Sequence, residues 1–79
     1  MRYLFTTKTC PNCRLAKEFL KGIPYVMIDA EENMELAARY GVMQVPSLVV
    51  VDGGEYHKYV NASNIKKYAQ EKKEQLALA

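Results

Sequence analysis

Apolar and polar positions along the chain follow two different spacings, and each change of spacing marks an expected element. Four short segments have the length and composition of strands, and they span residues 2–6, Tyr25 to Ile28, Ser47 to Val51 and Glu55 to Val60. Apolar residues recur at helical spacing in the remaining segments, which are residues 11–21, residues 32–40 and a last helix from near Ser63. The predicted order of elements is therefore βαβαββα.

Turn and cap residues predict where these elements begin and end. Gly22 is the expected C-cap of the first helix, and Asp29 or Ala30 is expected to precede the second helix. Asp52-Gly53-Gly54 has the composition of a hairpin turn between the last two strands. The unbroken apolar run from Ser47 to Val51 indicates a central strand that is buried on both faces. The last helix is expected to bury Ile65, Tyr68, Ala69 and Leu76.

The composition predicts one small domain that covers residues 1–79. Hydrophobic residues make up 49% of the chain, which is enough for one compact core. The net charge of +2 is too small to indicate a nucleic acid or a membrane surface as a partner. No apolar run approaches the roughly 20 residues of a membrane span, and the N-terminal pattern is not that of a secretory signal. We therefore expect a cytoplasmic monomer.

Cys10 and Cys13 are the only cysteines, and they are spaced C-x-x-C shortly after the first predicted strand. A strand that leads into such a pair at the start of a helix is typical of a dithiol redox site. In disulfide exchange one thiolate forms a mixed disulfide with the substrate, and a second thiol nearby must resolve it. Positions i and i+3 of a helix bring two side chains together, so the spacing supplies that second thiol.

The two cysteines are expected to have different roles. Pro11 suits the first helical position, which makes Cys10 the N-cap of the helix. Its sulfur then lies near the free N–H groups of Asn12 and Cys13, so its thiolate is favoured and its pKa falls below the roughly 8.5 of a free thiol. We expect Cys10 to be the nucleophile. Cys13 shares the inward face of the helix with apolar residues and is expected to be the shielded, resolving thiol.

Other interpretations of the cysteine pair are less well supported. A disulfide that only stabilises the fold would contribute little here, because closing a four-residue loop removes little entropy from the unfolded chain. A structural zinc site requires four ligands, and the remaining candidate, His57, is a single distant histidine. We expect no metal and no bound cofactor other than the redox-active disulfide. The positive charges of Lys8 and Arg14 would favour the thiolate, although Lys8 also fits a solvated loop lysine.

Three segments resemble the thioredoxin superfamily in its minimal form, and the resemblance covers nearly the whole chain. Residues 5–13 are similar to the corresponding segment of glutaredoxins, with a proline after the first cysteine. Residues 39–48 are similar to the thioredoxin segment that leads into its cis-proline, and the Asp52-Gly53-Gly54 turn followed by Asn61-Ala62-Ser63 is also thioredoxin-like. The resemblance implies an α/β fold with a four-stranded mixed sheet flanked by three helices.

The resemblance also implies roles for residues that are distant from the cysteines in sequence. Pro46 corresponds to the cis-proline of the family, and Val45 to the residue whose backbone N–H and C=O meet a bound peptide. Asn61 and Ala62 are implied to contribute to substrate binding. Asn61 stands where thioredoxins usually have glycine, and asparagine tolerates the left-handed conformation better than most residues.

Several positions depart from the family pattern. Leu4 stands where thioredoxins place a buried aspartate, so the usual proton acceptor for the resolving thiol is absent. Thr9 replaces their tryptophan, and Tyr25 replaces a lysine of the next strand. Glutathione-using glutaredoxins carry a Gly-Gly pair and an acidic pair after the outer strand, but here the Gly53-Gly54 pair lies earlier, in the turn. Glutathione is therefore a weaker candidate partner than a protein reductase.

The sequence thus predicts a protein dithiol-disulfide oxidoreductase that acts as a thioredoxin-like electron donor. It would reduce client proteins that contain disulfides, and a partner resembling thioredoxin reductase would supply the electrons. Two alternatives stay open. One is a glutathione-dependent glutaredoxin, and the other is a redox docking module dedicated to one client, such as ribonucleotide reductase.

Overall fold

The computed structural model describes the backbone of residues 1–78 and the side chains up to residue 75. Seven elements follow the predicted order, and they are β1 (Arg2–Thr6), α1 (Pro11–Phe19), β2 (Val26–Asp29), α2 (Met34–Arg39), β3 (Ser47–Asp52), β4 (Glu55–Val60) and α3 (Asn61–Leu78). Within the described part of the chain, no helix has the length and apolar character needed to cross a membrane.

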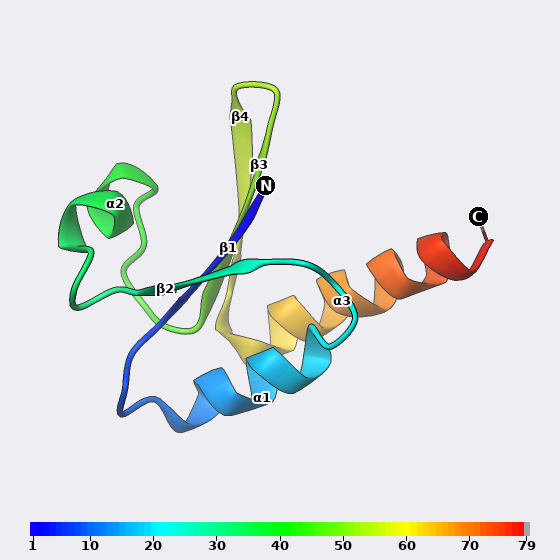
Figure 1. Cartoon of the computed structure of the whole chain (residues 1–79), viewed down its shortest axis with the longest axis horizontal. Helices are drawn as coiled ribbons and strands as arrows, with labels where there is room; N and C mark the ends of the chain where they lie inside the picture. The colour runs from blue at the N-terminus through cyan, green and yellow to red at the C-terminus, as the bar shows by residue number, and fades with distance from the viewer. Residues whose placement is uncertain (79) are drawn as a thin grey trace.

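The strands form one mixed sheet of four strands in the order β2-β1-β3-β4 (Figure 1). β1 is parallel to β2 and antiparallel to β3, and β3 is antiparallel to β4. Helices α1 and α3 lie together against one face of the sheet, and α2 packs against the other face (Figure 1). The predicted α/β fold, a four-stranded mixed sheet flanked by three helices, is confirmed.

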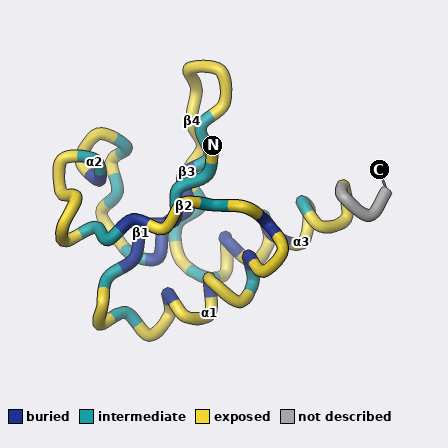
Figure 2. The backbone as a smooth tube through the Cα atoms, in the orientation of Figure 1, coloured by how far each residue is buried: buried dark blue, intermediate teal, exposed yellow. Residues whose placement is uncertain are grey.

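The central strands β1 and β3 contribute to a hydrophobic cluster on each face of the sheet, which explains their apolar sequences. Leu4 and Leu48 belong to the cluster on the α1 and α3 side, together with Ala16, Leu20, Ile23, Ile65 and Ala69. Phe5 and Val49 belong to the cluster on the α2 side, together with Ile28 and Ala37. Buried residues are concentrated on the central strands and on the facing sides of the helices (Figure 2). The prediction that the third strand is buried on both faces is confirmed.

Strand β2 is an edge strand, and it differs slightly from the prediction. It begins and ends one residue later than the predicted Tyr25 to Ile28. Val26 and Met27 are exposed, although the segment is apolar, because β2 pairs with a neighbour on one side only. The bounds of β1 and β4 agree with the prediction, and β3 extends one residue further than predicted.

Helix α1 ends earlier than predicted. Its C-cap is Leu20, whereas we had expected a helix over residues 11–21 that is closed by Gly22. Leu20 is fully buried in the cluster on the α1 and α3 side, and the chain then turns as the Ile23 N–H donates to the Leu20 carbonyl at 2.9 Å. Gly22 occupies the third position of this turn with a φ of 90°, where a positive φ favours glycine. The glycine therefore belongs to the turn rather than to the cap.

Helix α2 begins two residues later and ends one residue earlier than the predicted 32–40. The cause is a turn in which the Asp29 Oδ1 accepts a hydrogen bond from the Glu31 N–H at 2.9 Å. This turn delays the helix, so Asn33 is its N-cap, and Asp29 and Ala30, which we expected to precede a helix from about residue 32, lie further from its start than predicted.

The hairpin turn and the buried face of α3 agree with the prediction. Gly53 and Gly54 form the turn with φ values of 57° and 89°, as a two-residue hairpin turn with positive φ at both positions requires. On α3, Ile65 and Ala69 are buried, and Tyr68 is partly buried against the same cluster. The side chain of Leu76, which we also expected to be buried, lies outside the described residues.

A tyrosine pair joins β4 to α3. The ring centroids of Tyr59 and Tyr68 are 4.7 Å apart, and the Arg2 Nε donates a hydrogen bond to the Tyr68 hydroxyl at 2.7 Å. Burial, with smaller contributions from Tyr68 and Glu71, raises the pKa of Tyr59 above its ordinary value of 10.0. The neutral phenol of Tyr59 is therefore favoured in the folded state.

We expect Leu20→Ala to lower the free energy of unfolding by about 2 to 5 kcal/mol, because it removes a fully buried side chain from the cluster between sheet and helices. The matched control is Leu15→Ala, since Leu15 lies on the exposed side of α1 and should cost less than about 0.5 kcal/mol. Urea unfolding of both variants measures the difference. Equal losses would contradict the assignment of Leu20 to the core.

We expect Tyr59 to titrate later than the ordinary tyrosine value of 10.0, because its pKa is raised in the folded state. The stability that it contributes is present below the unfolded pKa and is lost as the pH rises through the folded pKa. Tyr59→Phe should therefore remove a late transition from the tyrosinate absorbance titration and should reduce the alkaline loss of unfolding free energy. A variant whose alkaline stability profile matches that of the parent protein would contradict the raised pKa.

Candidate dithiol redox site

Cys10 caps the N-terminus of helix α1. Its backbone is extended, with φ −92° and ψ 107°, and Pro11 follows at the first helical position. The Cys13 N–H donates a hydrogen bond to the Cys10 Sγ at 3.2 Å. One of the free N–H groups of the first helical turn is thus satisfied by sulfur. The predicted position of Cys10 as N-cap is confirmed.

Cys10 and Cys13 form a disulfide whose Cα atoms are 5.4 Å apart. Cys13 is only 2% exposed, whereas Cys10 is half-buried. Cys13 lies on the same side of α1 as the fully buried Ala16, and Arg14 on the other side is exposed. The predicted faces of the two cysteines are confirmed. A molecule in solution can therefore contact the sulfur of Cys10 more readily than that of Cys13.

A pocket of about 670 Å³ adjoins the disulfide, and both cysteines line it. Its other lining residues come from the end of β1, the loop after it, α1, β2 and the segment after β2, and they are Thr6, Thr7, Lys8, Arg14, Lys17, Met27, Ile28, Asp29, Glu32 and Asn33. Basic residues of the β1–α1 loop and of α1 therefore meet acidic residues at the end of β2 and in the segment after it.

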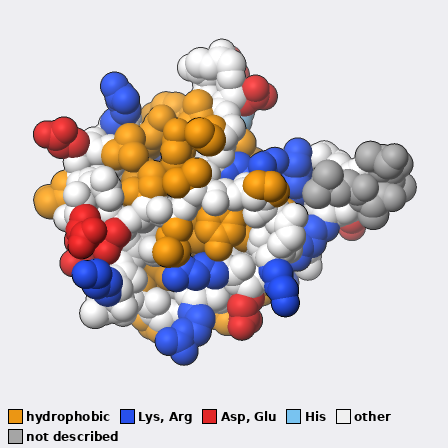
Figure 3. All heavy atoms as spheres, viewed as in Figure 1, with side chains coloured by type: hydrophobic (Ala, Val, Ile, Leu, Met, Phe, Trp, Pro, Cys, Tyr) orange, Lys and Arg blue, Asp and Glu red, His pale blue; other side chains and the backbone are white. Residues whose placement is uncertain are grey.

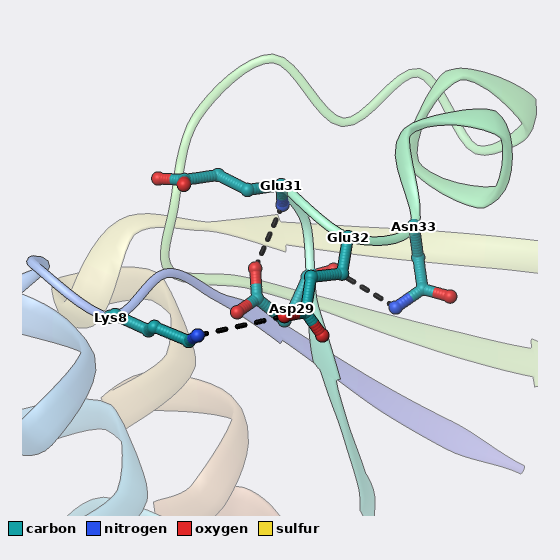
Figure 4. Close-up of polar contacts among 5 residues, drawn as sticks. All are labelled: Lys8, Asp29, Glu31, Glu32 and Asn33. Atoms are coloured by element: carbon teal, nitrogen blue, oxygen red, sulfur yellow. Dashed lines mark hydrogen bonds and ion pairs between the residues drawn. The ribbon is translucent and has the colours of Figure 1, made fainter.

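Lys8 reaches from the loop before α1 to Glu32 in the loop before α2, as Figure 4 shows. The Lys8 Nζ lies 3.6 Å from the Glu32 Oε1, and the two side chains are 79% and 68% exposed. Beside this pair, the Asn33 Nδ2 donates to the Asp29 carbonyl at 3.0 Å (Figure 4). Water and salt screen an ion pair as exposed as this one. Glu32 also offsets the positive charge that we had expected to act on Cys10.

The segment before β3 contains the Val45–Pro46 peptide bond, which is cis, as the resemblance implied. Pro46 is fully buried and Val45 is half-buried. The Ser47 hydroxyl donates to the Gln44 carbonyl at 2.6 Å, and the Asn61 N–H donates to the Pro46 carbonyl at 2.9 Å. These two hydrogen bonds fix the segment to the start of β3 and to the start of α3.

Asn61 has a φ of 70°, which confirms the left-handed conformation expected at this position. Its Oδ1 accepts a hydrogen bond from the Asn64 N–H at 3.1 Å, and the Asn64 Nδ2 donates to the Val60 carbonyl at 2.8 Å. These two bonds, both donated by Asn64, allow α3 to begin directly after β4, so the predicted start near Ser63 was two residues late. Asn61 is exposed, and Ala62 beside it is half-buried.

The core behind α1 is apolar. Leu4, at the position where thioredoxins have a buried aspartate, is fully buried in the cluster on the α1 and α3 side, and Tyr25 packs against that cluster. Among the described side chains the buried polar ones are Thr6 and Ser47, so none of them is a carboxylate. No three His, Cys, Asp or Glu residues of the described chain gather closely enough to hold a metal ion.

The structure brings some of the predicted site residues together and leaves others apart. Lys8 and Arg14 line the pocket beside the two cysteines, whereas Asn12 is exposed and does not line it. Sequence reasoning missed Asp29 at the end of β2 and Glu32 in the segment after it, which line this pocket together with Met27 of that strand. The available signal was the parallel pairing of β1 and β2, because the carboxyl ends of parallel strands meet at one edge of a sheet.

Comparison with known proteins places these features in a family. The glutaredoxin family model matches residues 3–57. A thioredoxin from Bacillus subtilis (strain 168) is 44% identical over 41 residues, which cover 52% of this chain and 39% of the relative. A thioredoxin from Methanocaldococcus jannaschii is 36% identical over 55 residues, which cover 60% of this chain and 65% of the relative. The chain spans between 39% and 65% of the length of the curated relatives that it matches.

The solved structures agree with this placement. A mutant thioredoxin from Halobacterium salinarum NRC-1 superposes with a TM-score of 0.75 at 25% identity, and the match covers 87% of this chain and 67% of that one. The family match includes most of β1, the disulfide, the cis-proline and most of the β3–β4 hairpin. The chain therefore belongs to the glutaredoxin family within the thioredoxin superfamily and has the thioredoxin fold.

Proposed function

We propose that this chain is a protein dithiol-disulfide oxidoreductase, a thioredoxin-like electron donor that reduces client disulfides through Cys10 and Cys13. The observation that carries the proposal is the unequal exposure of the two cysteines. Cys10 is half-buried at the N-terminus of α1, where its Sγ accepts the Cys13 N–H at 3.2 Å, and Cys13 is only 2% exposed. A two-step exchange requires an accessible attacking sulfur with a shielded sulfur beside it.

In the first step the Cys10 thiolate attacks one sulfur of the client disulfide. The client S–S bond breaks, a mixed disulfide forms, and the other client sulfur leaves as a thiolate. In the second step Cys13 loses its proton and attacks the Cys10 sulfur, which releases the second client thiolate and forms the Cys10–Cys13 disulfide. Two electrons pass to the client. A partner resembling thioredoxin reductase then returns two electrons to the chain.

The N-terminus of helix α1 is assigned the main part in stabilising the Cys10 thiolate. The Cys13 N–H already points at the sulfur, and Asn12 contributes another free N–H of the first turn. A charge at a helix N-terminus is typically stabilised by about 0.3 to 1 kcal/mol. Lys8 and Arg14 contribute less, because both are exposed and Lys8 is paired with Glu32.

We assign water in the adjoining pocket as the acceptor of the proton that Cys13 loses in the second step. Cys13 lines that pocket, and the buried aspartate that accepts this proton in thioredoxins is replaced here by Leu4. Exchange with water in an open pocket requires no buried carboxylate. This assignment makes the second step depend on access of water to the pocket.

Client binding is assigned to Val45, Pro46, Asn61 and Ala62. The hydrogen bond from the Asn61 N–H to the Pro46 carbonyl, at 2.9 Å, holds these two segments side by side. The backbone N–H and C=O of Val45 would pair with an extended client segment whose disulfide meets Cys10. We place this reaction in the cytoplasm, where thiols are kept reduced, and expect the chain to act as a monomer.

The match to the glutaredoxin family favours glutathione as a second candidate reductant. The position of the glycine pair argues against a dedicated glutathione site. Gly53 and Gly54 form the β3–β4 turn, whereas Pro46 precedes the opposite end of this hairpin, where Ser47 pairs with Val60. The glycines therefore cannot contribute to a pocket beside the cysteines.

We expect the protein to reduce insulin disulfides with NADPH and a thioredoxin reductase, and to reduce a small disulfide only slowly with glutathione and glutathione reductase. Cys10→Ser should abolish the insulin reaction, because it removes the attacking sulfur. Cys13→Ser should accumulate mixed disulfides with the client, since only the second thiol releases them. Turnover of NADPH measures the rates, and mass spectrometry under non-reducing conditions detects the mixed disulfides.

The double variant Cys10→Ser/Cys13→Ser is the matched control, and it should neither turn over nor trap a client. Faster turnover with glutathione than with thioredoxin reductase would replace the proposal with a glutathione-dependent activity. Trapping by Cys10→Ser instead of Cys13→Ser would reverse the assigned roles. Reduction of one client without general insulin activity would indicate a dedicated docking module.

A further inference from the structure

All four methionines of the chain are exposed. The exposed fractions are 69% for Met1, 56% for Met27, 73% for Met34 and 92% for Met43. Methionine commonly fills gaps in a hydrophobic core, yet neither core cluster of the described residues contains one. Large apolar side chains that are exposed close together mark interaction surfaces. The positions of these methionines therefore need a reason other than packing.

Met27 lies beside the disulfide. It stands on the edge strand β2, opposite Leu4 of β1, and it lines the same pocket as Cys10 and Cys13. A client segment whose disulfide reaches Cys10 would meet this side chain along one wall of the pocket.

Met34 and Met43 line a second hollow, of about 610 Å³, between α2 and the segment before Pro46. Most of its other lining residues are small or apolar, and these include Ala30, Ala37, Ala38, Val42 and Val45. The hollow is adjacent to the redox site, because Thr7 lines both hollows and its carbonyl accepts the Cys10 N–H at 3.4 Å. Hydrophobic side chains also gather around α2 and over β2 in the space-filling view (Figure 3).

The lining of the second hollow is mainly uncharged, so it favours apolar contacts over ion pairs. Among the described residues, Glu31 is the one charged side chain that lines this hollow. The nearby Lys58 Nζ already donates a hydrogen bond to the carbonyl of Gly41, a lining residue, at 2.9 Å. The occupant that fits is an extended client segment with large apolar side chains next to its disulfide. Unbranched, polarisable thioethers adapt to apolar side chains of different shapes.

We propose that Met27, Met34 and Met43 form a methionine collar that contacts apolar client side chains around the disulfide, and that peroxide weakens this contact by oxidising the collar. The proposal rests on the proposed function and names the client chemistry that the site selects. A methionine sulfoxide is polar, so it loses the apolar contact without changing Cys10 or Cys13. The collar thus makes client reduction sensitive to peroxide while exchange with small disulfides continues.

The modification is a two-electron oxygen transfer. The thioether sulfur attacks one oxygen of hydrogen peroxide, the O–O bond breaks, and the S–O bond of the sulfoxide forms. The second peroxide oxygen leaves and takes up a proton to become water. Sulfur is oxidised and peroxide is reduced. The cysteines are protected during this reaction when the protein is in its disulfide form, because no thiolate is then present.

The test treats the disulfide form with hydrogen peroxide, removes the peroxide with catalase, reduces the cysteines with dithiothreitol and then removes the dithiothreitol, which would otherwise reduce the substrates directly. Three disulfides are compared as substrates: a cystine peptide flanked by leucine and phenylalanine, the same peptide flanked by glycine, and neutral bis(2-hydroxyethyl) disulfide. We expect peroxide to slow reduction of the apolar peptide by about fivefold or more, with little effect on the other two. Mass spectrometry counts the sulfoxides and locates them.

Matched variants separate the collar from general damage. Met27→Leu/Met34→Leu/Met43→Leu keeps apolar side chains that peroxide does not oxidise, so its own rate with the apolar peptide should be the same before and after peroxide. Met1→Leu leaves the collar intact and should stay as sensitive as the parent. Far-ultraviolet circular dichroism verifies that each variant is folded.

Equal slowing of all three substrates, or the same slowing in the triple leucine variant, would overturn the proposal. No difference between the apolar and the glycine peptide before peroxide would also overturn it, because the collar would then make no contact. Failure of bis(2-hydroxyethyl) disulfide to react before peroxide would overturn the proposed function itself. That outcome is distinguishable from failure of the collar alone.

Discussion

The site depends on the hydrogen bond from the Cys13 N–H to the Cys10 sulfur at the start of α1. This bond places the first sulfur at the positive end of the helix, and the helix must bury Ala16 and Leu20 against the sheet. Because Cys13 lies on that inward side, it becomes shielded when the helix packs, while Cys10 stays accessible. The asymmetry between the two thiols therefore follows from the packing that holds α1 in place.

The rest of the site is assembled by sheet topology. The parallel pairing of β1 and β2 brings Asp29 and Glu32 to the edge where α1 begins. The β3–β4 hairpin pairs Ser47 with Val60, so the segments before β3 and after β4 meet, and the Asn61 N–H bonds to the Pro46 carbonyl. Residues of β1, α1, β2 and the segment after β2 thus meet at the disulfide, and the segments before β3 and after β4 meet each other.

The sequence was sufficient to predict features that depend on local chemistry. The order of elements and the roles of Pro11 and Cys10 at the helix start follow from the local sequence pattern, and the left-handed conformation of Asn61 was expected from the resemblance to thioredoxins. Boundaries set by side-chain turns were missed, since the bond from the Glu31 N–H to Asp29 competes with helix formation. The exposed methionines were also missed, because hydrophobicity alone favours burial, and only the edge position of β2 and the hollow beside α2 reveal their exposure.

The most direct measurement of the central claim is the order in which the two reduced thiols react with iodoacetamide at neutral pH. Brief labelling followed by tandem mass spectrometry should find the label on Cys10 well before Cys13, and this preference should disappear in denaturant, where neither the helix nor the burial is present. Labelling of Cys13 first, or at the same rate in the folded protein, would contradict the assignment of an accessible thiolate at the helix N-terminus with a shielded partner behind it.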